Sequence, residues 1–258
     1  MNLYKKYLSI HLKSELEYKS SFIISLIAQA FVTFSSYFVI LGLFSKFGNL
    51  KGYTIYQVMI IYGIIHLGFS INEVFNRGFD HFDKLIINGN LDRILTRPRN
   101  IYLQILGFDI DYSKLTRIIE NLIILLIGII KVNIIWIPLK ILTIIFMIIS
   151  SIIVFFSIYL IGAAVSFATT EGLEIKNIFT DGGRDMASYP IDIYKKSFKL
   201  FFTAIIPFAF VNYYPILYLL DIKTNIFYIF TPLITFLYLL PSILIFNLGL
   251  KKYTSTGS

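Results

Sequence analysis

The sequence contains no cysteine and few charged residues. Of its 258 residues, 15% are charged and 57% are apolar, and the mean hydropathy is +0.75. Soluble domains carry about 25% charged residues, so this composition is that of a protein that lies in a membrane. The lack of cysteine excludes disulfides and thiolate metal ligands, and it leaves the redox state of the compartment open.

A second absence concerns nucleotide binding. No stretch of the sequence fits G-x-x-x-x-G-K-[ST], the loop whose backbone amides hold nucleotide phosphates. If the protein uses ATP, the ATP-binding site must therefore lie in another chain. The acidic residues are spread along the sequence, whereas a metal that bridges phosphates needs clustered carboxylates. We expect this chain to bind neither a cofactor nor a metal.

Long uncharged runs are the main feature that is present. A membrane-spanning helix needs about 20 apolar residues, and the runs Ser20 to Ser45 and Ile141 to Ala168 contain no charged residue. The third candidate span holds Glu120 and Lys131, each near one of its ends, where charged side chains are tolerated. The sequence predicts an all-α integral membrane protein with a single domain, residues 1–258. The six spans are expected at about residues 22–45, 53–76, 115–135, 141–167, 191–208 and 225–250.

The basic residues indicate which side of the membrane each loop occupies. With six spans, the N-terminus, residues 77–117, residues 169–199 and the C-terminus share one side, and they hold 18 of the 23 Lys and Arg residues. Because cytoplasmic loops are enriched in Lys and Arg, we expect both termini in the cytoplasm of a bacterial cell and the chain in its cell membrane. The net charge of +8 then needs no nucleic-acid partner.

Two further patterns concern helix packing. Apolar residues recur every four positions from Tyr4 to Leu16, which predicts an amphipathic helix lying in the membrane interface before the first span. The fourth span carries small residues that allow another helix to approach closely, either within the chain or across to a partner. These residues are Ser150, Ser151, Ser157, Gly162, Ala163 and Ala164.

The segment between the second and third spans is predicted to contain a short helix of its own. Apolar residues continue at helical spacing to Ile86, so the second span should extend below the membrane and stop at Asn88-Gly89, where glycine adopts a left-handed conformation. Asn90 is a suitable N-cap for the next helix, and Pro98 disfavours its continuation. Such a capped helix suits docking onto a protein, and contact with anionic lipid is the alternative. The candidate residues are Asn88, Gly89, Asn90, Leu91, Asp92, Arg93, Ile94 and Leu95.

Two prolines interrupt the apolar stretch from Leu200 to Leu220. Proline lacks a backbone donor and clashes with the preceding helical turn, so one helix through Pro207 and Pro215 is not expected. We predict a fifth span over 191–208 and a re-entrant hairpin over 210–220, because broken backbone at membrane depth requires protein or a water-lined cavity beside it. The candidate hairpin residues are Pro207, Phe210, Tyr213, Tyr214 and Pro215.

Three blocks of the sequence resemble those of permeases from ATP-binding-cassette transporters of the type-2 exporter class. Gly89-Asn90-Leu91-Asp92, followed by Leu95-Thr96-Arg97-Pro98, is similar to the signature G-x-L-D-x-x-L-x-R-P. The family's second block is similar to Tyr189-Pro190-Ile191 and to Ile206 to Val211 with Tyr214-Pro215. Its C-terminal tail is similar to Gly249 to Ser258. Thr96-Arg97 and Asn100 stand where more apolar neighbours are expected.

The resemblance implies a transmembrane subunit without catalytic residues of its own, which forms half of a substrate pathway. It implies a second permease, identical or related, and two copies of a cytoplasmic ATPase that hold ATP and Mg. By position, Asn88 to Thr96 corresponds to the coupling helix that contacts the ATPase, and the N-terminal interfacial helix braces it. The prolines Pro207 and Pro215 correspond to a re-entrant hairpin that seals the extracellular side.

The remaining polar residues suggest less specific roles. His66 lies in the middle of the second span, where a hydrogen-bonded contact between helices is favoured over a proton relay. Asp80, His81 and Asp83 are expected on a solvated face, because neighbouring positions point in different directions on a helix. Glu120 is expected to pair with Arg117 at the membrane boundary.

The second function considered is a membrane-embedded enzyme that acts on lipid or isoprenoid phosphates. Its site would contain Asp181, Arg184 and Asp185, which flank a Gly-Gly pair in a segment expected to be a loop. Two glycines without a preceding strand are weak support for phosphate binding, so the permease is preferred. Neither the transported substrate nor the choice between homodimer and heterodimer follows from the sequence.

Overall fold

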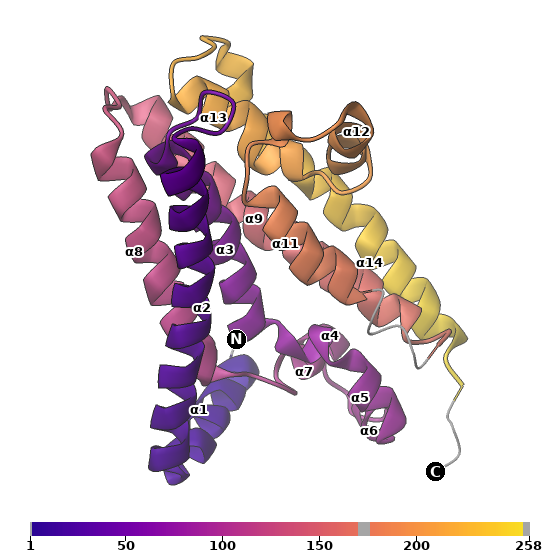
Figure 1. Ribbon diagram of the computed structural model, residues 1–258. Coiled ribbons are helices and arrows are strands. Elements are labelled where there is room, and N and C mark those ends of the chain that lie inside the picture. The colour runs from indigo at the N-terminus through magenta and orange to yellow at the C-terminus, as the bar shows by residue number, and fades with distance from the viewer. Residues whose placement is uncertain (1, 170–175, 255–258) are drawn as a thin grey trace.

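The computed structural model describes residues 2–169 and 176–254, and the regular structure in these ranges is helical apart from an isolated bridge between Leu50 and Tyr53. Figure 1 shows long helices side by side above a base of short ones. The N-terminal half contains α1 (Asn2–Glu17), α2 (Lys19–Phe47), α3 (Ile55–Phe75), α4 (Arg77–Asp80), α5 (Phe82–Ile87), α6 (Asn90–Leu95), α7 (Ile101–Leu106), η1 (Tyr112–Lys114) and α8 (Leu115–Lys131). The C-terminal half contains α9 (Pro138–Val165), η2 (Ile178–Gly182), α11 (Gly183–Ala187), η3 (Ile191–Ile193), α12 (Lys196–Ala204), η4 (Ala209–Tyr213), α13 (Tyr214–Leu219), η5 (Ile226–Ile229), η6 (Thr231–Ile234) and α14 (Thr235–Lys252).

Four helical stretches are long and apolar enough to cross a membrane: α2, α3, α9 and the continuous stretch from η6 through α14. The pair Lys196–Ala204 and Ala209–Leu219 makes a fifth candidate if it is counted as one span, although its two halves meet at 91°. Four of the six predicted spans are thus confirmed as long apolar helices. The predicted third span corresponds to α8, whose 17 residues lie at the lower limit for crossing a bilayer.

The prediction of a continuous fifth span over 191–208 is wrong. This stretch holds a 3₁₀ turn, then the nine residues of α12, and then the bend, which contains Pro207. A proline in the bend cannot donate the hydrogen bond that would continue the helix. The helices η2 and α11 come before this stretch in the chain, and they pack against α9 and α3 (Figure 1). The segment predicted as the loop 181–185 is therefore helical.

The bend also changes the position of part of residues 169–199, which are predicted to lie on the same side as the N-terminus. Lys199 pairs with Asp192 at 2.8 Å, and the Lys51 ammonium donates to the Asp192 carbonyl. Because Lys51 lies in the turn between α2 and α3, Lys195, Lys196 and Lys199 belong to the end of the molecule opposite α4–α7. The predicted 18 basic residues on one side are thus reduced to 15, against eight on the other. Residues 170–175 of the same segment lie outside the described residues.

The helix α3 is the centre of the bundle. In its most apolar stretch 89% of the residues are buried, compared with 11% in α2. The Asn72 amide donates to the carbonyls of Gly68 and Ile152, which ties α3 to α9. Ser151 of α9 donates to the Ile65 carbonyl at 3.4 Å. The small residues of the fourth span thus pack within the chain.

The second span does not continue below the membrane as predicted. The helix α3 ends at Phe75, and the chain turns at Asn76 and again at His81, which separates α4 and α5 from it. Figure 1 shows these short helices running away from the base of α3. The Arg77 guanidinium lies 3.3 Å from the Asp111 carboxylate and holds this turn against the segment before α8.

The predicted interfacial helix, α1, packs beneath the bundle. Its Tyr4 hydroxyl donates to the Phe75 carbonyl, and its Glu15 carboxylate accepts the backbone N–H of Tyr112 at 3.0 Å. Burial raises the pKa of the Glu15 carboxyl. The Tyr112 hydroxyl donates to the Leu8 carbonyl. These hydrogen bonds join α1 to the end of α3 and to the segment that follows α7.

The close crossing of α4 and α7 gives a test of this base. A Cβ atom at Gly78 would lie 1.8 Å from the Ile105 carbonyl oxygen, which is backbone. Gly78→Ala should lower the stability of the purified protein by about 1–3 kcal/mol, the usual cost of overpacking, and lower its thermal unfolding midpoint. Gly42→Ala in α2 is the matched control, because its Cβ would meet nothing within 4 Å. Equal midpoints for the two variants would contradict the crossing.

Candidate functional site

The helix α6 is the short helix predicted between the second and third spans. Gly89 has φ 65° and precedes it in the left-handed region, where glycine is favoured. Gly89 takes the N-cap position and Asn90 is the first helical residue, so the predicted cap is off by one position. The Thr96 N–H donates to the Asp92 carbonyl, and the helix ends before Pro98 as predicted.

The two faces of α6 differ in burial. Leu91 and Ile94 are buried, whereas Arg93 and Leu95 are exposed. Ile87, just before the left-handed turn, is 57% exposed. Asn88 is exposed as well, and Gly89, Asn90 and Asp92 are partly buried. The outer face therefore presents two large apolar side chains beside basic residues, and the inner face anchors the helix.

The anchor is a cluster of aromatic rings shared with two membrane helices. Phe246 of α14 lies 5.4 Å from the ring of Phe79 and 5.3 Å from that of Phe82, between ring centroids. Leu91 and Ile94 belong to the same buried cluster, together with Tyr159 and further residues of α9. A displacement of α6 therefore acts directly on the lower ends of α9 and α14.

Polar contacts fix the ends of α6. The Gln104 side-chain amide donates to the carbonyls of Ile94 and Arg99, each at 3.3 Å, which attaches α6 to α7. Burial and the nearby Asp92 carboxylate raise the pKa of the Tyr253 hydroxyl, so the segment after α14 also reaches α6. Of the predicted C-terminal block, residues 255–258 lie outside the described residues.

Asp80, His81 and Asp83 do not form the predicted solvated face. Asp80 pairs with Lys176 at 2.8 Å, and Asp83 is buried. The His81 Nδ1 atom lies 2.7 Å from the Asp109 carboxylate. Burial raises the pKa of Asp109, but the hydrogen bond and charge of His81, together with the charges of Arg77 and Lys84, outweigh burial, and the pKa is lower than usual. Within residues 2–169 and 176–254, no three His, Cys, Asp or Glu side chains are grouped to hold a metal.

The predicted hairpin residues lie in the bent pair at the opposite end. Pro207 is buried in the bend, and Pro215 is tolerated in the first turn of α13 after the π-helical η4, so the second proline does not break the helix as predicted. Tyr214 stacks on Phe210 with a centroid distance of 5.4 Å, and the Lys199 ammonium lies 4.4 Å from the centre of the Tyr213 ring. Within the bend, Ile206 and Phe208 are buried beside Pro207, whereas Ile205 is exposed.

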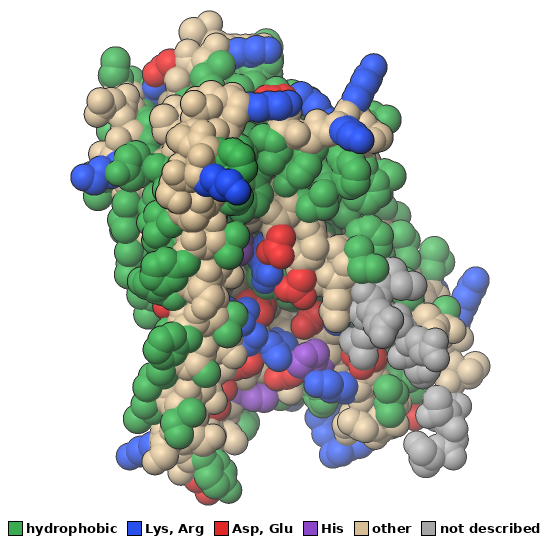
Figure 2. Space-filling view, viewed as in Figure 1, with side chains coloured by type: hydrophobic (Ala, Val, Ile, Leu, Met, Phe, Trp, Pro, Cys, Tyr) green, Lys and Arg blue, Asp and Glu red, His purple; other side chains and the backbone are tan. Residues whose placement is uncertain are grey.

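A polar cavity of about 310 Å³ lies between α2, α3, α8 and η2–α11, and sequence reasoning missed it. Figure 2 shows acidic and basic side chains gathered in this hollow. At its base, Glu73 accepts hydrogen bonds from Lys114 at 2.9 Å and Arg117 at 2.8 Å. Arg117 therefore pairs with Glu73 rather than with Glu120 as predicted.

His66 lies in the same cavity wall and contacts another helix as predicted. Its Nε2 atom is 2.9 Å from the Ser188 hydroxyl, which itself donates to the Arg184 carbonyl. Since serine has one hydroxyl proton, His66 must donate from Nε2. The Arg184 guanidinium lies over the Phe69 ring and pairs with Asp181 and Asp185. The charged residues that line the cavity come from separate segments of the chain, so no local sequence pattern predicts that they lie together.

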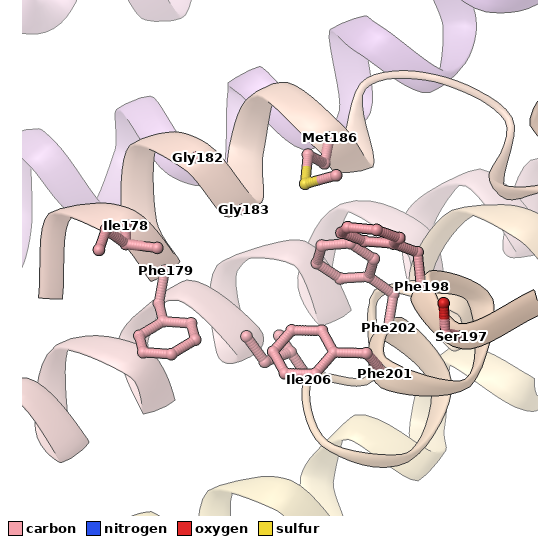
Figure 3. Close-up of a pocket in the computed structure, with 10 residues that line it drawn as sticks. All are labelled: Ile178, Phe179, Gly182, Gly183, Met186, Ser197, Phe198, Phe201, Phe202 and Ile206. Atoms are coloured by element: carbon pink, nitrogen blue, oxygen red, sulfur yellow. The ribbon is translucent and has the colours of Figure 1, made fainter. Parts of the chain in front are cut away.

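An apolar pocket of about 480 Å³ lies on the other side of η2–α11 (Figure 3). Ile178, Phe179 and Met186 of that segment face the rings of Phe201 and Phe202. The segment thus has one polar face, toward the charged cavity, and one apolar face.

The comparisons with known proteins identify the family. No curated protein and no solved structure matches this chain. The model of the ABC-2 family transporter protein, ABC2_membrane_6, matches residues 30–257. This match covers α2 from residue 30 onward, the other long apolar helices, the aromatic anchor of α6 and the bent pair. With several apolar helices and a family match over most of its length, the chain is a multi-pass membrane protein that belongs to the ABC-2 transporter family.

Proposed function

We propose that the chain is the permease subunit of an ATP-driven exporter and forms half of its substrate pathway. The observation that carries this proposal is the position of α6. Its inner residues Leu91 and Ile94 belong to the cluster that includes α9 and α14, while Arg93 and Leu95 point outward. A helix with this arrangement can receive a force on one face and transmit it through the other.

The force would come from two copies of a cytoplasmic ATPase that binds ATP and Mg. Shifting a two-state pore from 1:99 to 99:1 needs about 5.5 kcal/mol of differential binding. A single exposed ion pair at Arg93 contributes at most about 1 kcal/mol, so a groove must receive the whole exposed face. Ile87 and Leu95 supply the apolar part of such a contact.

The second half of the pathway would be another permease, identical or related. Among the four candidate spans, α2 is the least buried, and it carries exposed Ile24, Phe31 and Phe38. It also lines the charged cavity through Thr33 and Ser36. A second permease against α2 would cover both surfaces. In the same arrangement, the bent pair around Pro207 would close the outer end of the pathway.

The first prediction concerns the side of the membrane on which α6 lies. Because the chain has no cysteine, Arg93→Cys and Phe227→Cys each carry a single thiol. A membrane-impermeant maleimide should label Phe227→Cys in intact cells, since that ring is 74% exposed at the end opposite α6. Arg93→Cys should react only after the membrane is opened. Labelling of Arg93→Cys in intact cells would refute a coupling role for α6.

The second prediction tests the partner. In a complex with the proposed ATPase, a bifunctional thiol reagent should join Arg93→Cys to a single-cysteine ATPase variant. Phe227→Cys is the control and should give no product. The amount of product should change when ATP is added, because the grip of the ATPase on α6 must differ between nucleotide states. Efficient cross-linking from Phe227→Cys instead would contradict the proposal.

The third prediction separates the two faces of α6. Arg93→Glu should weaken retention of the ATPase about fivefold, equivalent to about 1 kcal/mol at an exposed ion pair, without changing the unfolding midpoint of the permease. Leu91→Ala should lower stability by about 2–5 kcal/mol, because it empties part of a buried cluster. A normal midpoint for Leu91→Ala, measured by thermal unfolding, would show that α6 is not anchored as described.

A further inference from the structure

The charged cavity is constructed from buried polar groups on helices that lie in the membrane. His66, Ser70, Glu73 and Asn121 are all at least nine-tenths buried, and each lines the cavity. Polar groups at such positions are costly and mark substrate or ion pathways. The volume of about 310 Å³ is at the lower end of the range for small-molecule sites.

The base of the cavity carries an excess positive charge. One carboxylate, Glu73, faces two cations, Lys114 and Arg117, and both of its oxygens are hydrogen-bonded. The Nε–H of Arg117 has no hydrogen-bond acceptor among the described residues. Asn121 donates to Ser70, but its carbonyl oxygen is also buried without a partner. The unpaired N–H of Arg117 can donate to an anionic group. The unpaired oxygen of Asn121 can accept a hydrogen bond from a donor on that group or from a water bound to it.

The rim of the cavity carries the opposite charge. Here one cation, Arg184, lies 3.0 Å from Asp181 and 2.9 Å from Asp185. The two carboxylates are exposed over 56% and 64% of their side-chain surface, whereas the Arg184 side chain is 17% exposed. Of these two carboxylates, Asp181 lines the cavity. Because Asp185 shares the covered guanidinium, the group carries a net negative charge, and Asp181 can attract a cation.

The two ends exclude simpler ligands. A plain anion attracted to Lys114 and Arg117 would also face Asp181, which lines the same cavity, and a plain cation would meet two cations at the base. A molecule that carries both charges satisfies both ends. Between the two charged ends, the cavity wall includes Tyr62, which stacks on His66 with ring centroids 3.7 Å apart. These rings can contact an apolar linker between the two charges of a ligand.

We propose that this cavity binds a zwitterion, with its anionic group toward Arg117 and its cationic group toward Asp181. As a statement about the transported substrate, this depends on the proposed permease function. Binding itself does not depend on it. The source is either a free zwitterion or the headgroup of an amphiphile, and the two share the same charges.

The test measures binding to the purified full-length chain in maltoside detergent, without ATPase or nucleotide. The probe is dihexanoylphosphatidylcholine below its micelle concentration, and the read-outs are native mass spectrometry and titration calorimetry. Arg117→Gln should weaken binding about tenfold or more, the loss of one charge-assisted hydrogen bond to the phosphate. Asp181→Asn should weaken it about fivefold, the loss of the attraction between an exposed carboxylate and a quaternary ammonium, which has no N–H to donate. Lys131→Gln, at the exposed far end of the same helix as Arg117, and Glu17→Gln, on the exposed surface of α1, should bind as wild type.

Two further probes decide the chemistry. Dihexanoylphosphatidylglycerol has the same chains without the cation and should bind more weakly. Glycerophosphocholine should compete if the ligand is a free zwitterion, and its failure to compete assigns the site to a headgroup with chains attached. The proposal would be overturned if both lipids bound equally well and Asp181→Asn had no effect. It would also be overturned if none of the probes bound. Because Asp181 is exposed, its variant remains informative if Arg117→Gln unfolds.

Discussion

The burial of Phe246 of α14 against Phe79 and Phe82 joins the short helices α4–α7 at the base of the bundle to its long helices. Within lipid, apolar side chains gain little by contacting one another, because the tails are equally apolar. Where such rings would otherwise face water, burying each contributes about 1.5–3 kcal/mol. The cluster therefore holds α4–α7 rigidly to α9 and α14, and close-packed interiors transmit displacement rather than absorb it. Without this contact, α6 would be a helix on a loose loop, and its exposed face would have no rigid connection to α9 and α14.

The opposite logic governs the centre of the bundle, where polar groups need partners because lipid offers none. Asn72 meets this requirement by donating to carbonyls on α3 and α9, and Ser150 does so by donating to the Pro232 carbonyl. The cavity around Glu73 retains orphaned polar atoms beside its ion pairs. The helix bundle thus separates two kinds of polar position, those that hold helices together and those that face an internal space.

Much of the fold could be predicted from local patterns. The long uncharged runs located α2, α3, α9 and α14, and the Asn88-Gly89 pair located the turn before α6, because glycine tolerates φ 65° where other residues are strained. The helical segment η2–α11 could not be placed in this way. Its residues around Arg184 are charged, so hydropathy assigned them to a loop, whereas the structure pairs Arg184 with Asp181 and Asp185. Pairings such as Arg117 with Glu73 join residues 44 positions apart, and no local pattern encodes them.

The segments η2 and η4 are π-helical, and they stand on either side of the interrupted stretch that contains α12. A π-helical turn accommodates about one residue more than an α-helical turn. In η4 this wide turn carries Phe210, whose ring stacks on that of Tyr214 directly after the turn, and Tyr214 also contacts Tyr228 of η5. The turn thus connects the bend at Pro207 to the segment that follows α13 through a row of aromatic rings.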